Sequence, residues 1–460
     1  MGDRQHAIAL YNQGVEASKQ NQYPTHLQHA YKLFASACFA DPTWWQAFYQ
    51  AGNNNVDQKL GFSALACFRR ALQCEITDPV EHARVFANMC WQLEESAQVD
   101  EALECGLKSI EADPNCVLGH LNLSVVYRDL DDTANSVKHA EQAYAIDPTN
   151  MLSEINMAFA NLFARNFATG LKFFEKRFEW RLHHFLHYPY PQWHGEKGKT
   201  VVLVADQGLG DTLSYARFVR QACERAGYVH AIVQHELMRL FQHAFVDIKN
   251  LNIIPGLQAN FPAADAWTTF VSLPNALGLN DDEIRNAPQI KAPHFSLPKS
   301  WKVKDRKFHI GIAWGGSPLN DIDRHRNIPM TEFYELYRVP GVQLYSLQVG
   351  ERGREMVDSG GAPLIGDLTP YIHDIVDTVA LMQDLDLVIT VESALGHICA
   401  LAEKEAWIPY SFYGRDYRIG LTGEDQLWSK HTIFRQDKTA QWRPVFNRII
   451  AALQDRLQTS

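Results

Sequence analysis

Three glycine-containing turns hold the residue types from which a chemical site could be built. The first is residues 206–212, Asp-Gln-Gly-Leu-Gly-Asp-Thr, where Gly208 and Gly210 let the backbone turn tightly and approach a ligand without a Cβ in the way. Asp211 follows at the expected start of a helix, where its carboxylate could accept a proton from a hydroxyl as a general base. The alternative is an ordinary N-cap that satisfies N–H groups of the helix, and composition alone favours the cap.

The second turn lies far along the chain and is rich in arginine. Gly315 and Ser317 lead into residues 321–327, Asp-Ile-Asp-Arg-His-Arg-Asn, which place Arg324 and Arg326 near a glycine turn. Guanidinium groups carry permanent charge and offer forked donors, which suits a diphosphate. A solvated charged loop explains the pattern equally well.

The third turn is residues 390–397, Thr-Val-Glu-Ser-Ala-Leu-Gly-His. Backbone N–H groups at the start of the helix expected there could hold phosphate oxygens. Ser393 could add a hydroxyl donor, and Glu392 could accept a hydrogen bond from a ribose. The alternative is again a helix cap, with Glu392 and His397 as packing or surface residues.

Three familiar motifs fail on closer reading. A dinucleotide fingerprint would need a glycine at Leu213, and a P-loop ending at residues 198–200 would need one at Trp193. Asp-x-Asp patterns, which elsewhere hold a metal on a nucleotide sugar, occur at residues 321–323 and again at 384–386. Because the pattern is so easily matched, we assign no metal and expect no cofactor beyond a co-substrate.

Each of these turns needs a strand to position it. Short apolar runs that could form strands fall into two series, at residues 200–205, 230–233, 251–254 and 269–271, and at 308–314, 343–346, 387–390 and 407–409. Strands alternating with helices predict parallel sheets, and ligands of such sheets bind at the carboxyl ends of the strands. We expect two Rossmann-like domains facing one another, at residues 196–300 and 301–460. The final helix, with Trp442 and Phe446, is expected to pack back across both.

The first third of the chain has a repeat. Asp-Pro dipeptides recur at residues 41–42, 78–79, 113–114 and 147–148, close to the 34-residue period of tetratricopeptide (TPR) repeats. Each is expected to end a helix, because the residue before proline is pushed out of the helical region. This predicts an α-helical TPR solenoid over residues 1–165, followed by a connecting helix or linker over 166–195. The concave face of such a solenoid would dock a polypeptide, unless the module is purely structural or dimerising.

Composition narrows the class of protein. The chain has 460 residues, 46% hydrophobic and 21% charged, which is the balance of a soluble globular protein of two or three domains. The net charge of -10 argues against a nucleic-acid binder. The N-terminal segment lacks a secretory pattern, and no apolar run is long enough for a membrane span. Eight scattered cysteines without a CxxC pair indicate buried thiols in a reducing, cytoplasmic setting.

Four segments together resemble a known family. They are PQWHGEKGKTVVLVADQGLGDTLSYARFV, IGIAWGGSPLNDIDRHRNIPMTEF, DLDLVITVESALGHICALA and HTIFRQ. They look like the blocks of bacterial TPR proteins whose C-terminal part is a GT-B glycosyltransferase related to the heptosyltransferases (glycosyltransferase family 9-like). The resemblance covers nearly the whole chain in the same order. O-linked N-acetylglucosamine transferases, which join similar repeats to a GT-B unit, are similar in architecture.

The resemblance implies a metal-independent, inverting transfer of a hexosyl or heptosyl group from a nucleotide-diphosphate sugar. It implies a catalytic base at Asp211. It also implies that the donor and its phosphates contact a set of residues in the second domain: Arg324, Arg326, Ser393, Ala394, His397, Asp416 and Arg418. Glu392 stands where the family usually has aspartate, Ala394 replaces a glycine, and residues 401–414 are more polar than the hydrophobic strand expected there.

The sequence therefore predicts a glycosyltransferase whose acceptor is a protein or peptide docked on the TPR face. One alternative is a non-catalytic TPR scaffold with a degenerate transferase fold. Another is a transferase that acts on a glycan or lipid. The sequence does not identify the sugar, the nucleotide or the acceptor. It also does not determine whether the chain is a monomer or a homo-oligomer.

Overall fold

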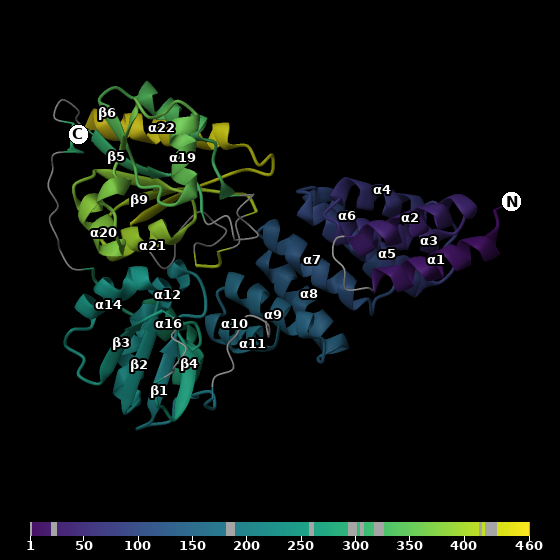
Figure 1. The fold of residues 1–460 in the computed structure, drawn as a ribbon, viewed down its shortest axis with the longest axis horizontal. Helices are drawn as coiled ribbons and strands as arrows, with labels where there is room; N and C mark the ends of the chain where they lie inside the picture. Colours follow the sequence, from purple (N-terminus) through teal and green to yellow (C-terminus); the bar gives the residue numbers. More distant parts are fainter. Residues whose placement is uncertain are drawn as a thin grey trace. The chain divides into compact units, whose positions relative to one another are not determined.

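The computed structural model describes residues 2–19, 25–180, 189–256, 262–292, 301–303, 308–316, 326–413, 416–418 and 430–459. The chain divides into two compact units, unit 1 (Met1–Ala164) and unit 2 (Arg165–Ser460). The regular elements described in unit 1 are all helices, whereas unit 2 contains two parallel β-sheets with their helices (Figure 1).

Unit 1 is a TPR-like helical solenoid built from helix pairs. Successive helices pack in pairs, α1 with α2, α3 with α4, α5 with α6 and α7 with α8. Their bounds are α1 Arg4–Ser18, α2 Thr25–Ala40, α3 Trp45–Asp57, α4 Gly61–Leu72, α5 Pro79–Glu95, α6 Val99–Ala112, α7 Val117–Asp129, α8 Thr133–Ile146 and α9 Met151–Phe163. Small residues let the helices approach: Ala102 and Ala143 are fully buried, and a Cβ at Gly52 would lie 2.4 Å from Cε1 of Phe68.

Three of the four Asp-Pro dipeptides directly follow the end of a helix, as predicted, at α2, α6 and α8. The prediction is wrong at Asp78-Pro79, which begins a helix. Asp78 is the N-cap of α5, and its carboxylate accepts a hydrogen bond from the backbone N–H of Val80 at 2.9 Å. Proline suits the first helical position, because its fixed φ is already helical and no intrahelical N–H bond is lost there.

The first sheet of unit 2 has the strand order β3-β2-β1-β4, with every pairing parallel. Its strands are β1 Thr200–Val204, β2 Tyr228–Val233, β3 Leu251–Pro255 and β4 Ala266–Thr269. The helices of this half are α10 Phe167–Phe174, α11 Arg177–Trp180, α12 Leu209–Tyr215, α13 Val219–Arg225, α14 Met238–Ala244, α15 Leu273–Leu277 and α16 Asp281–Asn286. In register, Val201 of β1 is paired with Val229 of β2 and with Ala266 of β4.

The second sheet has the order β10-β9-β8-β5-β6-β7 and is also parallel. Its strands are β5 Phe308–Ala313, β6 Val342–Ser346, β7 Ile365–Asp367, β8 Leu387–Thr390, β9 Ala406–Tyr410 and β10 His431–Arg435. Its longer helices are α18 Met330–Tyr334, α19 Arg354–Asp358, α20 Ile375–Gln383, α21 Ala394–Leu401 and α22 Trp442–Thr459. The residues of β9 are all buried, so the polar stretch around it still supplies an interior strand.

All eight predicted strands overlap observed ones, although β4 ends at Thr269, where the predicted strand began. Two strands, β7 and β10, were not predicted. The expectation that the last helix packs across both sheets is wrong. The apolar face of α22, with Phe446 and Ile449, is buried in one cluster whose members all lie between Phe308 and Leu453. Trp442 donates its indole N–H to the carbonyl of Asn327 at 2.9 Å, also within the second half.

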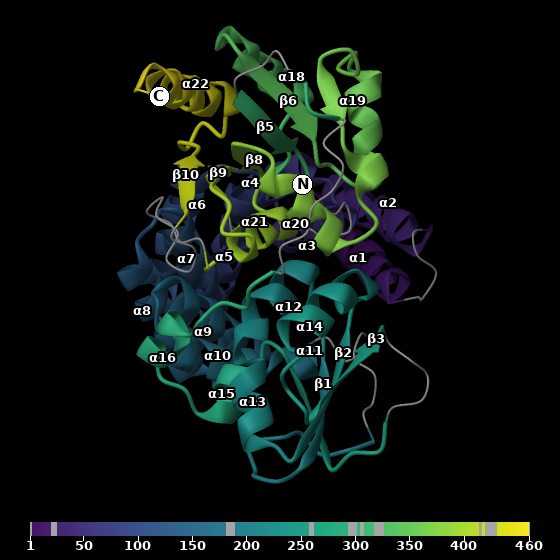
Figure 2. The same ribbon diagram turned by 90° about the vertical axis from the view of Figure 1, so that its left-hand side faces the viewer.

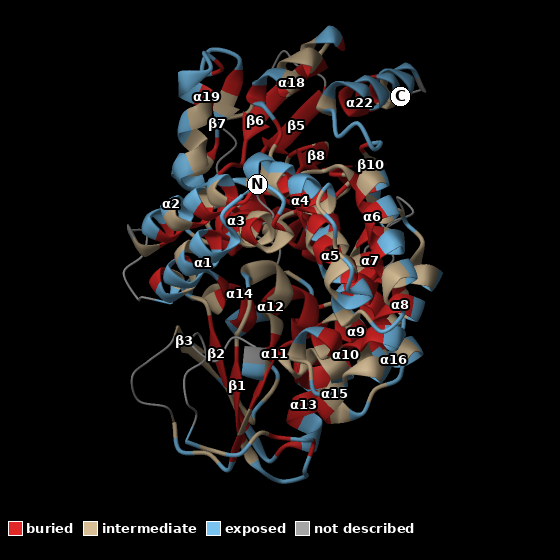
Figure 3. Cartoon of the chain, turned by 90° about the vertical axis from the view of Figure 1, so that its right-hand side faces the viewer, coloured by how far each residue is buried: buried red, intermediate tan, exposed pale blue. Residues whose placement is uncertain are grey.

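Two helix pairs join the halves of unit 2. Helix α12, which follows β1, packs against α21, which follows β8, and α14 packs against α20 (Figure 2). Buried residues lie along the strands, as in β1, β2, β5 and β6 (Figure 3). Because α12 and α21 pack together, the turns at the carboxyl ends of β1 and β8 meet where the two halves of unit 2 join, a place called the junction below.

Among the described residues, no helix combines the length and the apolar character that a membrane crossing requires.

Candidate functional site

Asp211 lies in the first turn of α12, at the carboxyl end of β1. The N-cap of α12 is Gly208, so the interpretation of Asp211 as the N-cap is wrong. Its side chain instead reaches toward the second half of unit 2, and it remains 30% exposed. Burial raises the pKa of Asp211 above its usual value, although the charge of Arg418 opposes this effect.

Arg418 connects the two halves of unit 2. Its Nη1 donates hydrogen bonds to Oδ1 of Asp211 at 3.0 Å and to Oγ of Ser214 at 3.1 Å. Its Nε and Nη2 donate to the two carboxylate oxygens of Asp416, at 2.7 and 2.8 Å. Burial acts to raise the pKa of Asp416, but the ion pair and hydrogen bonds with Arg418 outweigh it and hold that pKa below its usual value. One guanidinium thus holds two carboxylates, of which Asp416 is only 3% exposed.

His397 fills the contact between α12 and α21. A Cβ at Gly210 would lie 2.7 Å from Cδ2 of His397, so only glycine allows the two helices to come this close. The Nδ1 of His397 lies 3.1 Å from Oγ of Ser214, and its Nε2 lies 3.9 Å from Oδ2 of Asp416. Burial, reinforced by the charge of Arg418, lowers the pKa of His397 to about 3, so the ring is neutral at pH 7.

Ser393 and Ala394 begin α21. Ser393 is the N-cap, and its hydroxyl accepts a hydrogen bond from the backbone N–H of Leu395 at 3.3 Å. Ser393 and Ala394 are both half-buried, in contrast to the fully buried His397. The capping interpretation of this turn is therefore confirmed for Ser393, while His397 is a packing residue and not a surface residue.

Glu392 and Arg326 form a buried pair beside this turn. The Nη1 of Arg326 donates to the backbone carbonyl of Glu392 at 3.1 Å and lies 3.7 Å from its Oε1. A Cβ at Gly316 would lie 2.1 Å from Nη2 of Arg326, so this glycine makes room for the guanidinium. Burial and the negative charge of Asp416 raise the pKa of Glu392, and the two arginines only partly offset this.

The glycine turn after β5 is held by Gln348. The Oε1 of Gln348 accepts hydrogen bonds from the N–H groups of Trp314 and Gly315, both at 3.0 Å. The N–H of Gly315 is thus already satisfied within the protein. Ser317 and Arg324, which the sequence nominated beside this turn, lie outside the described residues.

Sequence reasoning missed several residues that complete the junction. Ser214 lies one turn along α12 from Gly210 and Asp211, so helical spacing alone could have indicated it. Tyr215 and Tyr417, one from each half, place their hydroxyl oxygens 2.5 Å apart in a buried contact. No local pattern in the sequence points to that pair.

Arg177 supports the turn that carries Asp211. This buried side chain donates through Nε to Asp206 at 3.0 Å and through Nη2 to Thr269 at 2.7 Å and Ser272 at 2.8 Å. Asp206 directly precedes the glycine turn, and Thr269 ends β4. Arg177 therefore joins the carboxyl ends of β1 and β4 and fixes the start of the turn.

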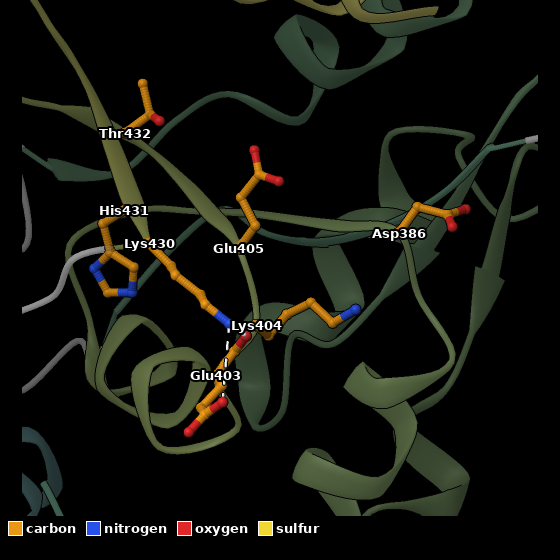
Figure 4. Close-up of a pocket in the computed structure, with 7 residues that line it drawn as sticks. All are labelled: Asp386, Glu403, Lys404, Glu405, Lys430, His431 and Thr432. Carbon is orange, nitrogen blue, oxygen red and sulfur yellow. Dashed lines mark hydrogen bonds and ion pairs between the residues drawn. The ribbon is translucent and has the colours of Figure 1, made fainter. Parts of the chain in front are cut away.

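A separate cavity of about 550 Å³ opens at the amino ends of β8, β9 and β10 (Figure 4). It is lined by charged and polar residues: Asp386, Glu403, Lys404, Glu405, Lys430, His431 and Thr432. The Nζ of Lys430 donates to the backbone carbonyl of Glu403 at 2.8 Å, and Glu405 is paired with Arg456 at 2.7 Å. Because ligands of parallel sheets bind at the opposite, carboxyl ends, we assign the functional site to the junction.

The comparisons with known proteins are distant. No family model matches the chain. FlbA of Caulobacter vibrioides is 21% identical over 450 residues, covering 82% of this chain and 73% of FlbA.

Solved structures, among them two TPR proteins, are similar to part of the chain. YrrB, described as a TPR protein with an unusual peptide-binding site, is 18% identical, with a TM-score of 0.30 over 39% of this chain and 88% of YrrB. TTC0263, a TPR protein of Thermus thermophilus, is 16% identical, with a TM-score of 0.32 over 38% of this chain and 92% of that protein. PilW, a type IV pilus biogenesis factor, is 17% identical, with a TM-score of 0.35 over 40% of this chain and 81% of PilW.

Proposed function

We propose that this chain transfers a sugar from a nucleotide-diphosphate sugar to an acceptor hydroxyl, with Asp211 as the general base. One observation carries the proposal. Asp211, at the carboxyl end of a central parallel strand, lies 3.0 Å from Arg418, which comes from the half of unit 2 that contains the second sheet. Of the three charged groups in this network, Asp211 is the most exposed, at 30% against 10% for Arg418 and 3% for Asp416. It is therefore the carboxylate that a substrate can reach.

In this scheme the acceptor oxygen attacks the anomeric carbon of the donor, and Asp211 takes the hydroxyl proton. The bond from that carbon to the diphosphate oxygen breaks, and the nucleoside diphosphate leaves with the bonding electrons. Arg326, Arg418 and the start of α21 at Ser393 stabilise the negative charge that develops, an effect that is large in a site shielded from water. Asp416 orients the guanidinium of Arg418 by its two hydrogen bonds.

We propose that the acceptor is a protein or peptide bound by unit 1. Helical solenoids expose long curved faces that bind partners, and the TPR-like helix pairs of unit 1 provide such a face. A glycan or lipid acceptor would leave that face without a role in the reaction.

A second candidate function is a non-catalytic scaffold. The observation that favours it is that several groups expected to hold phosphate are already bonded within the protein. The N–H of Gly315 is bonded to Gln348, and the hydroxyl of Ser393 caps α21. In a scaffold these bonds would be permanent, and no nucleotide would bind.

Thermal unfolding with UDP, GDP, ADP, CDP and dTDP tests the two functions against each other. A nucleotide at 100 times its dissociation constant stabilises the folded state by roughly 2.7 kcal/mol. The transferase predicts that one nucleotide raises the unfolding temperature and that the effect is weakened by Arg326→Ala. If none of the five raises it at millimolar concentration, the transferase is rejected in favour of the scaffold.

A further inference from the structure

Residues 416–418, Asp-Tyr-Arg, contain two of the charged groups of the site and are held through their backbone. The N–H of Asp416 donates to the hydroxyl oxygen of Tyr410 at 3.1 Å, and that hydroxyl donates to the carbonyl of Asp416 at 3.4 Å. Tyr410 is the last residue of β9 and is fully buried. The first residue of the segment is therefore tied to the carboxyl end of a strand, where ligands of parallel sheets bind.

The peptide group between Tyr417 and Arg418 is bonded on both of its edges. The Nη1 of Arg165 donates to the carbonyl of Tyr417 at 3.1 Å. The N–H of Arg418, which belongs to the same peptide group, donates to Oδ1 of Asp416 at 2.9 Å. Because a peptide group is planar and rigid, these two bonds fix its orientation. They therefore also fix the point from which the side chain of Arg418 extends.

Arg165 lies at a turn whose shape recurs along the repeats. Its φ is +70°, in the left-handed region that few residues other than glycine adopt. The residues two positions after the ends of α3, α5 and α7 share this conformation: Lys59, Ala97 and Asp131, with φ of 60°, 62° and 64°. The turn is therefore a feature of the repeats, whereas the bond to Tyr417 belongs to the turn that follows α9.

The chain that follows Arg165 is fastened to the first half of unit 2. The backbone N–H of Ala168 donates to Oδ1 of Asp281, the first residue of α16, at 2.7 Å. Helix α10 also packs against α15 and α16. Because Tyr417 belongs to the half that contains the second sheet, Arg165 is one more link between the two halves.

Tyr417 is held at both of its ends. Arg165 binds its carbonyl, and its hydroxyl oxygen lies 2.5 Å from that of Tyr215 on α12. The next residue, Arg418, places its Nη1 3.0 Å from Oδ1 of Asp211 on the same helix. The position of the Arg418 guanidinium beside Asp211 thus depends on a main chain that Arg165 helps to hold.

We propose that Arg165 is a positioning residue of the site. By holding the peptide group between Tyr417 and Arg418, it places the guanidinium of Arg418 for the diphosphate of the donor. This rests on the proposed function, which gives Arg418 that ligand. Arg165 acts through the main chain of Tyr417 and not by contact with the donor. Misplacing a group that positions a substrate by about 1 Å can cost about 10²-fold in rate, so such a residue has a measurable effect.

The first test is residue-resolved amide hydrogen exchange of the full-length protein. Arg165→Gly removes the side chain and keeps the turn, because glycine adopts positive φ readily. The amide of Arg418 is expected to exchange about tenfold faster in this variant, since its peptide group has lost one of two bonds. Lys59→Gly is the matched control, because Lys59 occupies the same turn position after α3 and its side chain is exposed. It should leave the exchange of Arg418 unchanged.

The second test is affinity for whichever of UDP, GDP, ADP, CDP and dTDP stabilises the wild-type protein, measured by isothermal titration calorimetry. Arg165→Gly should bind that nucleotide about fivefold more weakly, whereas Arg165→Lys, which can still donate a hydrogen bond, should stay within about twofold of wild type. If Arg165→Gly does not fold, Arg165→Met replaces it in both tests, because methionine keeps most of the side-chain volume but has no N–H to donate.

Unchanged exchange at Arg418 in Arg165→Gly overturns the inference, as does nucleotide affinity equal to that of wild type. Equal losses in Arg165→Gly and Arg165→Lys also overturn it, because the donated hydrogen bond would then not be the cause. Failure of the proposed function is distinct: the wild-type protein would bind none of the five nucleotides, while the exchange of Arg418 would still increase in Arg165→Gly.

Discussion

Arg418 and Asp211 are joined by a hydrogen bond of 3.0 Å between the two halves of unit 2. Arg418 also donates two hydrogen bonds to Asp416. The same guanidinium therefore positions the carboxylate of Asp211 and balances the negative charge of the buried Asp416. A second function of this residue, holding the departing diphosphate, would follow from its position at the carboxyl ends of the strands. The predictions below separate its structural contribution from the chemistry.

Replacing Arg418 by alanine should destabilise the protein by about 3–5 kcal/mol, because it leaves the buried carboxylate of Asp416 without its partner. Urea unfolding followed by intrinsic fluorescence measures the change. The double variant Arg418→Leu, Asp416→Leu should regain part of the loss. As a matched control, Arg220→Ala breaks an ion pair with Asp247 whose side chains are 50% and 61% exposed, and it should have no measurable effect. An equal effect of the two alanine variants would contradict the buried pair.

Replacing Gly210 by alanine should separate α12 from α21, because its Cβ would lie 2.7 Å from the ring of His397. Overpacking of this kind costs about 1–3 kcal/mol, and transfer activity should fall with it as Asp211 moves. Gly208→Ala is the control for stability, since the nearest atom to its Cβ, Oδ2 of Asp211, is 3.5 Å away and its φ of -65° suits any residue. Equal stability of the two variants would show that the close approach of α12 and α21 does not matter.

Glu392 should make the protein less stable as pH rises. Its pKa is raised to about 8 in the folded protein, against roughly 4.3 in an unfolded chain. Between these values the folded state binds more protons than the unfolded state, so the stability that this group contributes at low pH is lost as pH rises through 8. Glu392→Gln should therefore gain free energy of unfolding relative to wild type between pH 5 and pH 8.5.

Urea unfolding of both proteins at several pH values gives that difference. The exposed Glu351→Gln variant should show none of this dependence. A difference between Glu392→Gln and wild type that is constant with pH, or that shrinks as pH rises, would contradict a protonated Glu392.

The repeat architecture was predictable because each TPR-like unit contacts mainly its neighbours, which makes the period visible in the sequence. Strands were predictable where they are buried on both faces, as in β5 and β8. The strand β7 has only three residues, and β10 lies at the edge of its sheet with a single buried residue, Phe434, so neither stands out as an apolar run. The Asp78-Pro79 dipeptide was misread because a proline can either follow the end of a helix or occupy the first position of one, and Pro79 begins α5.

The site was predictable only in its parts. Local motifs nominated Asp211, Ser393 and His397, since each follows a strand. The bond from Arg418 to Asp211 spans 207 residues of sequence, and the hydroxyl contact of Tyr215 with Tyr417 spans 202. Such contacts depend on how the two halves of unit 2 pack, which no spacing within a motif encodes.

The central claim is that Asp211 is the general base of a sugar transfer, and the most direct test is turnover by Asp211→Asn. Once a nucleotide is identified by thermal unfolding, transfer from the corresponding labelled nucleotide sugar is measured together with donor affinity. We predict that Asp211→Asn loses about 10²–10⁴-fold in kcat while donor affinity stays within about threefold of wild type, because the base acts on the acceptor. Full turnover by Asp211→Asn would contradict the account.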